Sequence, residues 1–208
     1  MPLPAAPEAD KLRNQDIARR IWTEALDPIG TAVEVYLKHR GVGLPDAPVI
    51  RFHPHCPRTG GALPAMVALM VDPITGEPCG AHRTYLQPDG RGKAAVTPAK
   101  MMLGSAGVVR LAAPISEGLG LAEGVETALS VMVMIRWGPV WAAGSSGGIA
   151  RFPVLQGHAL TIFADGDAPG MAAARSCAAR WTEAGREALI WTAPAGEDWN
   201  DAARRIAA

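Results

Sequence analysis

Four acidic side chains stand just after apolar runs in the second half of this chain, and carboxylates placed in this way are able to hold a metal ion. They are Glu123, Asp165, Asp167 and Asp198. Carboxylates that lie close together repel one another unless a cation sits among them. Oxygen ligands without histidine or cysteine suit Mg²⁺ or Mn²⁺. Such an ion binds phosphate oxygens and stabilises displacement at phosphorus, so the acids indicate phosphoryl-transfer chemistry.

A simpler interpretation is that these acids cap helices. Aspartate is a favoured residue at helix N-termini, and Asp167 precedes the sequence Ala-Pro-Gly, which is typical of a helix start. One Asp-x-Asp pair would be weak support for a metal. A Glu-Gly after one apolar run and an Asp-Gly-Asp after another, within one α/β unit, favour a metal site.

The elements that must position the acids alternate between strand and helix from about residue 114 onwards. This alternation predicts a Rossmann-like sheet of about four parallel strands with helices on both faces. Ligands bind outside the carboxyl ends of the strands in such a sheet, where the acids stand. The expected strands are 119–122, 139–143, 159–164 and 187–192, and the expected helices are 126–137, 170–184 and a last helix from 199.

The first half of the chain has a different pattern. Two amphipathic helical segments, 10–27 and 31–40, precede short β-like runs at 49–52, 65–71, 80–86 and 108–111. This order predicts a small α+β domain. We therefore expect two domains, residues 1–113 and residues 114–208.

Charge is distributed unevenly although the chain has 20 basic and 20 acidic side chains and a net charge of zero. Residues 1–49 carry 6 Lys/Arg and 7 Asp/Glu, residues 50–110 carry 7 and 3, and residues 111–208 carry 7 and 10. The basic middle part is suited to phosphate groups, although a solvated strand face would also be polar. The residues expected to contact nucleic acid or a nucleotide are His82, Arg83, Lys93 and Lys100.

The acidic motifs resemble those of a known family. Glu-Gly at 123–124, Asp-Gly-Asp-x-x-Gly at 165–170 and Asp-Trp-Asn-Asp at 198–201 are similar to the Toprim domain of primases, topoisomerases and certain nucleases, and most of all to phage and plasmid primase-helicases. Arg-Gly-Val at 40–42 and His-Arg-Thr-Tyr-Leu at 82–86 extend this resemblance to the first half.

The resemblance implies roles for the acids. Glu123 corresponds to the Toprim glutamate that binds metal or acts as general acid/base. Asp165 and Asp167 correspond to the metal-binding pair, and Asp198 stands where a second metal site would be completed.

The function expected from this resemblance is Mg²⁺- or Mn²⁺-dependent nucleotidyl transfer, that is, primase-like primer synthesis on single-stranded DNA from nucleoside triphosphates. A Toprim nuclease that cleaves phosphodiesters and a non-catalytic DNA-binding module of a replication or mobile-element system are the alternatives. Neither a helicase module nor a zinc ribbon is visible in the sequence, so we expect such a partner to act in trans if one is required.

Other classes of protein fit less well. The apolar run 128–135 is far shorter than the ~20 residues that cross a bilayer, and no export signal is visible, so we expect a cytoplasmic protein without membrane contact. A zinc site built from His53, His55, Cys56, Cys79 and His82 is a minor alternative. The Gly-Ser-Ser-Gly-Gly at 144–148 matches a hydrolase nucleophile elbow, but no acid and histidine follow it in the required order.

Overall fold

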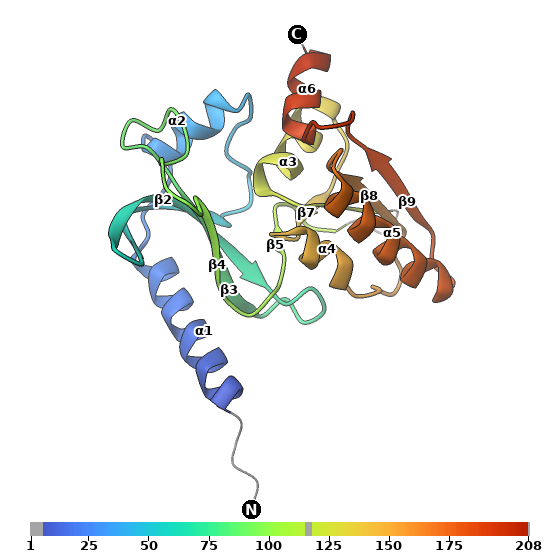
Figure 1. Cartoon of the computed structure of the whole chain (residues 1–208), viewed down its shortest axis with the longest axis horizontal. Helices are drawn as coiled ribbons and strands as arrows, with labels where there is room; N and C mark the ends of the chain where they lie inside the picture. Colours follow the sequence, from blue (N-terminus) through green and yellow to red (C-terminus); the bar gives the residue numbers. More distant parts are fainter. Residues whose placement is uncertain (1–5, 115–117, 208) are drawn as a thin grey trace, which may run out of the picture. The chain divides into compact units, whose positions relative to one another are not determined.

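A computed structural model describes residues 6–114 and 118–207, and these residues form two compact units (Figure 1). The first unit contains residues up to 39 together with 48–107. The second contains the segment 40–47 together with the residues from 108 onwards. The segment 40–47, which the sequence pattern groups with the N-terminal domain, thus belongs to the unit that carries the acidic motifs.

The first unit is a small α+β domain, as the sequence predicted. Its antiparallel sheet has the order β1-β2-β3-β4, formed by β1 (Ile50–Arg58), β2 (Gly61–Val71), β3 (Pro78–Tyr85) and β4 (Lys100–Gly104). The helices of this unit are α1 (Ala6–Glu24) and α2 (Ala32–His39). The strand β4 was not expected from the sequence, and it converts β3 from an edge strand into an inner strand.

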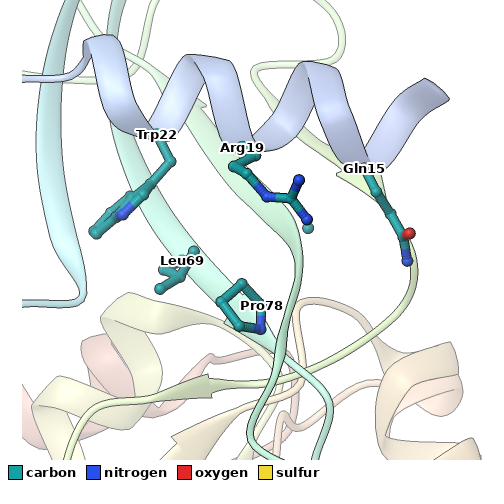
Figure 2. Close-up of a pocket in the computed structure, with 6 residues that line it drawn as sticks. Gln15, Arg19, Trp22, Leu69 and Pro78 are labelled. Atoms are coloured by element: carbon teal, nitrogen blue, oxygen red, sulfur yellow. The ribbon is translucent and has the colours of Figure 1, made fainter. Parts of the chain in front are cut away.

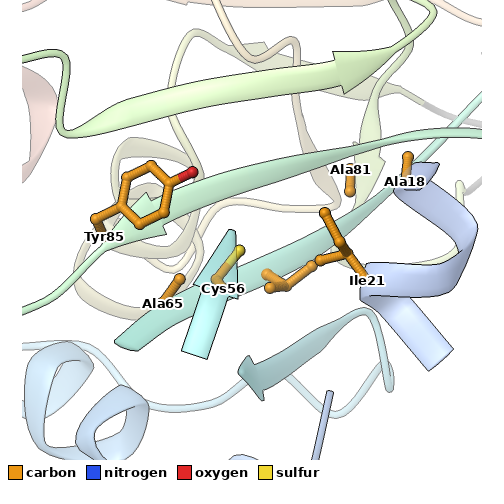
Figure 3. Close-up of a cluster of buried hydrophobic side chains, with 7 residues drawn as sticks. Ala18, Ile21, Cys56, Ala65, Ala81 and Tyr85 are labelled. Carbon is orange, nitrogen blue, oxygen red and sulfur yellow. The ribbon is translucent and has the colours of Figure 1, made fainter. Parts of the chain in front are cut away.

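The core of the first unit joins α1 to the sheet. Ala18 and Ile21 on α1 lie against Cys56 on β1 and against Ala81 and Tyr85 on β3 (Figure 3). Their spacing of three places Ala18 and Ile21 on one face of the helix. Since all five side chains are buried, this contact supplies the apolar burial that holds α1 on the sheet.

The second unit contains the predicted parallel sheet. The strands β6 (Leu119–Ala122), β7 (Val140–Ala142), β8 (Leu160–Ala164) and β9 (Ala188–Thr192) pair in parallel in the order β7-β6-β8-β9. Every residue of β6, β7 and β8 is buried, so these strands are covered on both faces, which explains why their sequences are mainly apolar. The run at 108–111 contributes β5 (Val109–Arg110), which pairs antiparallel with β7 at the edge of this sheet.

Helices connect the parallel strands. The α-helices are α3 (Val125–Ser130), α4 (Ser146–Arg151), α5 (Ala168–Glu183) and α6 (Trp199–Ala207). The single helix expected at 126–137 is instead α3 followed by one π-helical segment, η1 (Val131–Ile135), which ends at Arg136 with a left-handed φ of 57°. None of the helices in the described residues is long and apolar enough to cross a membrane.

Candidate functional site

The four acids lie at the carboxyl ends of the parallel strands of the second unit. Glu123 follows β6 directly, and Asp165 follows β8 directly. These two strands are paired neighbours, with Ala122 opposite Phe163, so Glu123 and Asp165 follow adjacent strand ends, and Asp165 lies one residue further along its strand direction than Glu123. Asp167 immediately precedes α5 and Asp198 immediately precedes α6.

Two backbone hydrogen bonds bring the loops that follow β8 and β9 together. The N–H of Gly166 donates to the carbonyl of Glu197 at 2.9 Å, and the N–H of Gly196 donates to the carbonyl of Gly166 at 2.9 Å. The loops approach so closely that a Cβ atom at position 166 would lie 2.0 Å from the carbonyl oxygen of Pro194. Glycine is therefore required there, and this contact sets Asp165 and Asp198 near each other.

The pKa of Asp165 indicates that the acids are near one another. Its pKa rises from 3.8 to about 6, first because the carboxyl is partly buried and then because Glu123 and Asp198 carry like charge beside it; Asp167 adds a smaller effect. A backbone hydrogen bond from Trp199 works in the opposite direction. The Oδ1 atom of Asp165 is buried and has no hydrogen-bond partner. An unpartnered anionic oxygen among three further carboxylates is the environment that a cation would stabilise.

Helix capping, the simpler interpretation, is real for two of the acids. Asp167 Oδ1 accepts a hydrogen bond of 2.7 Å from the N–H of Gly170 at the start of α5. Asp198 Oδ1 accepts one of 2.8 Å from the N–H of Asp201 in α6. Because a carboxylate has two oxygens, each cap leaves the second oxygen of that side chain for another partner.

The chemistry of these donors fits a hard divalent cation such as Mg²⁺, because all of them are carboxylate oxygens and one is buried without a partner. Across residues 6–114 and 118–207, however, no three His, Cys, Asp or Glu side chains lie close enough together to hold one ion. An ion would therefore have to draw these carboxylates inward as it bound.

One cation that was not among the predicted site residues lies against these acids. The guanidinium of Arg40 is 3.5 Å from Asp198 Oδ2 and 3.9 Å from Asp201 Oδ1. Both contacts lie within the second unit, because the segment 40–47 belongs to it. The only signal for Arg40 in the sequence was its place in the Arg-Gly-Val motif.

The predicted nucleic-acid residues all lie in the first unit, and they differ in exposure. His82 and Arg83 on β3 are only 2% and 5% exposed, and Arg83 donates to the carbonyl of Pro57 at 3.0 Å. The expectation that these two residues meet a phosphate backbone does not fit this placement, because a buried cation does not reach a solvated phosphate. Lys93 is exposed in the connection between β3 and β4, and Lys100 is half-buried at the start of β4.

Two other motifs have structural roles. The described cysteines, Cys56, Cys79 and Cys177, are buried free thiols whose pKa values are raised by burial, and none belongs to a metal-binding group in the part of the chain that the structure describes. The hydroxyl of Ser145 caps α4 by accepting from the N–H of Gly148 at 3.1 Å. The zinc interpretation therefore has no support in the described residues, and Ser146, which holds the nucleophile position of the hydrolase motif, is the first residue of α4.

A pocket of about 130 Å³ lies between α1 and the sheet of the first unit (Figure 2). Its lining is mainly apolar: Gln15, Arg19 and Trp22 extend into it from α1, and Leu69 and Pro78 line it from the sheet. The guanidinium of Arg51 lies 4.4 Å from the centre of the Trp22 ring. The pocket contains no predicted site residue and no carboxylate, so the metal chemistry is not located there.

Comparison with known proteins gives a family assignment for each half of the chain. Residues 12–111 match a domain of unknown function, DUF7146, and residues 118–208 match the Toprim domain. No curated protein is significantly similar to the sequence.

Solved structures with a similar fold are primase domains. The Aquifex aeolicus primase fragment with zinc-binding and RNA polymerase domains has a TM-score of 0.58 at 17% identity, and the similarity covers 95% of this chain and 57% of that one. A Pseudomonas aeruginosa DNA primase domain gives 0.59 at 12% identity, over 92% and 74% of the two chains. Primase domains of phage T7, solved with its lagging-strand DNA polymerase, an RNA/DNA hybrid and dTTP, give 0.50 at 15% identity, over 75% and 76%.

Proposed function

From the premise that this chain is a Toprim-domain protein with the fold of primase domains, we propose that it catalyses metal-dependent nucleotidyl transfer on nucleic acid. The reaction we propose is the synthesis of primers on single-stranded DNA from nucleoside triphosphates. The observation that supports this most strongly is the set of carboxylates around Asp165, whose pKa is raised to about 6 by burial first and then by the like charges of Glu123 and Asp198.

In this proposal Glu123, Asp165, Asp167 and Asp198 hold one or two Mg²⁺ or Mn²⁺ ions. The bound metal would neutralise phosphate charge and stabilise the in-line displacement. Asp165 provides the buried oxygen, while Asp167 and Asp198 are held in place by the helix caps they form. Glu123 is anchored through its main chain, since its carbonyl accepts a 2.8 Å hydrogen bond from the N–H of Gly144.

The proposed contacts to the substrate backbone come from exposed cations. Lys93 and Lys100 stay candidates, because they are at least partly exposed, whereas His82 and Arg83 support the sheet of the first unit. We propose single-stranded DNA and nucleoside triphosphates as substrates. A helicase and a zinc-ribbon chain acting in trans are the partners that a phage or plasmid replication role would need, and that role would place the protein in the cytoplasm.

A template-extension assay tests this proposal. The protein is incubated with single-stranded DNA, labelled ribonucleotides and Mg²⁺ or Mn²⁺, beside the variants Asp165→Asn and Glu123→Gln. Glu183→Gln is the matched control, because Glu183 is an exposed acid on α5 outside the cluster. We expect labelled oligonucleotides from the wild type and the control and none from the other two variants.

Other outcomes of the same assay would favour the alternatives. Template shortening that depends on Asp165 would identify a nuclease that uses the same acids. A protein that retards the template in a gel but forms neither product would refute a catalytic role and leave a DNA-binding module.

A further inference from the structure

The segment 40–47 is closely packed against the rest of the second unit, to which it belongs. Gly41 has a φ of +74°, and a Cβ atom at this position would lie 2.6 Å from Met134 Cε and 3.6 Å from Arg204 Cγ. Val42, the next residue, is only 4% exposed. The left-handed φ favours glycine at this position, and the packing of the chain beside η1 and α6 restricts where Arg40 can lie.

The side chain of Asn200 fixes the main chain of Arg40. Its Nδ2 atom donates to the carbonyl of Arg40 at 2.8 Å and to Ser130 Oγ at 2.6 Å, and Ser130 Oγ donates to the carbonyl of Glu126 at 2.8 Å. Asn200 is fully buried, yet its Oδ1 atom has no hydrogen-bond partner. A buried polar atom without a partner lowers stability, so any benefit of an asparagine here must come from the two bonds it donates.

The guanidinium of Arg40 consequently has a defined place at the edge of the carboxylate set. Its side chain is 24% exposed, it lies 3.5 Å from Asp198 Oδ2, and its Nε atom is buried without a hydrogen-bond partner. The ion pair with Asp198 is long and not bidentate, so it is a weak restraint by itself. The position of the cation depends on the main-chain bond from Asn200 more than on the ion pair.

We infer that Asn200 is a positioning residue which holds the Arg40 guanidinium against Asp198, so that Arg40 serves as the protein's own cation at the carboxylate site. A divalent ion and the guanidinium repel each other, so Arg40 competes with the ion for Asp198. A bound ion would take Asp198 as a ligand, and Arg40 would then be available to pair with a phosphate group of the substrate. The inference rests on the proposed metal site, but not on whether that site extends or cleaves nucleic acid.

Titration of the whole chain with Mn²⁺, followed by electron paramagnetic resonance without nucleic acid or nucleotide, tests the inference. Arg40→Gln removes the competing charge, and we expect its Kd for Mn²⁺ to fall at least threefold. Asn200→Ala is expected to shift the Kd in the same direction and to have no further effect in the Arg40→Gln background. Arg205→Gln is the matched control, because Arg205 pairs with Glu197 at 3.1 Å and should leave the Kd within twofold.

Four results would overturn the inference. An Arg40→Gln variant that binds Mn²⁺ no more tightly than the wild type would show that Arg40 does not compete. An effect of Asn200→Ala that persists without Arg40 would show that Asn200 acts on α6 itself. If Asn200→Ala fails to fold, Gly41→Ala strains the same segment through its left-handed φ of +74°, and an unchanged Kd in that variant would be equally contrary. No Mn²⁺ binding by the wild type would refute the metal site, and this inference with it.

Discussion

Replacing Asp165 with asparagine is expected to abolish metal binding and yet to stabilise the metal-free protein. The wild-type carboxyl is held among like charges and partly out of water, so its ionised form is disfavoured in the folded state. Asparagine has nearly the same shape and no charge, and it retains an oxygen that accepts the backbone hydrogen bond from Trp199.

The size of this stabilisation follows from the pKa. A rise from 3.8 to about 6 is a shift of about 2 units, which corresponds to about 3 kcal/mol as an upper limit. Because the carboxyl of Asp165 is partly exposed, solvent screening reduces this to roughly 1–2 kcal/mol. The melting temperature of the metal-free Asp165→Asn variant should therefore exceed that of the wild type by roughly 2–8 °C at pH 8.

The difference must also depend on pH with a definite sign. Since the folded state binds the proton of Asp165 more tightly than the unfolded state, the wild type loses stability as the pH rises from about 4 to about 6 and then levels off. The gain from Asp165→Asn should accordingly be near zero at pH 4 and complete above pH 7.

Tryptophan fluorescence during thermal unfolding in a chelating buffer is the appropriate measurement, because five of the six tryptophans stand at positions 137–199 in the second unit. Asp167→Asn is the control, since Asp167 is exposed and asparagine also caps helices well. Its melting temperature should stay close to that of the wild type. An Asp165→Asn variant that melts below the wild type at pH 8, or a difference that is the same at pH 4 and pH 8, would refute the reasoning.

Three further substitutions separate structural from substrate-binding roles. Gly166→Ala would place a Cβ atom 2.0 Å from the Pro194 carbonyl oxygen. It should therefore lower the free energy of unfolding by about 1–3 kcal/mol and weaken Mn²⁺ binding. Gly43→Ala is the control, because the space around Gly43 is open and neither quantity should change. Arg83→Met should lower the melting temperature through loss of its buried hydrogen bond, with no change in the single-stranded DNA affinity of the folded protein by fluorescence anisotropy. Lys93 is exposed, so Lys93→Ala should leave the melting temperature unchanged. It should reduce the slope of log affinity for single-stranded DNA against log salt concentration by about one. An unchanged slope would exclude Lys93 from the DNA-binding surface.

The parallel sheet was predictable from the sequence because its strands are buried on both faces. Such strands appear as short, mainly apolar runs, as in Leu-Thr-Ile-Phe-Ala at 160–164, and polar residues begin abruptly where each run reaches the edge of the sheet. The grouping of Glu123 with Asp165 follows from the same topology, since neighbouring parallel strands end side by side.

The exposure of the basic residues was not predictable, because it depends on a strand without a local signal. The strand β4 has the sequence Lys-Met-Met-Leu-Gly, which lacks the β-branched residues and the alternation typical of strands. Its pairing beside β3 makes β3 an inner strand, and α1 covers the face on which Ala81 and Tyr85 lie. Arg83 is two residues from each of them along the strand, so its side chain lies on the same face and is buried there.

The placement of Arg40 beside Asp198 was not predictable from the sequence for a different reason. The segment 40–47 has no secondary structure of its own, and the bond that fixes it comes from Asn200, which is 160 residues away in the sequence. Periodicity and spacing describe local order and carry no information about such a contact.

The four acids look equivalent as a sequence motif, but the structure gives them different partners. Asp167 caps α5, and Asp198 both caps α6 and faces Arg40, so part of the charge of each is already compensated. Asp165 has the buried oxygen without a partner and the raised pKa. Because clustered carboxylates are tolerated only when something offsets their charge, a guanidinium at Asp198 and, below about pH 6, a proton at Asp165 do so in the absence of metal. A divalent ion at the proposed site would take the place of both, and Asp165 is the acid whose charge would gain most from that exchange.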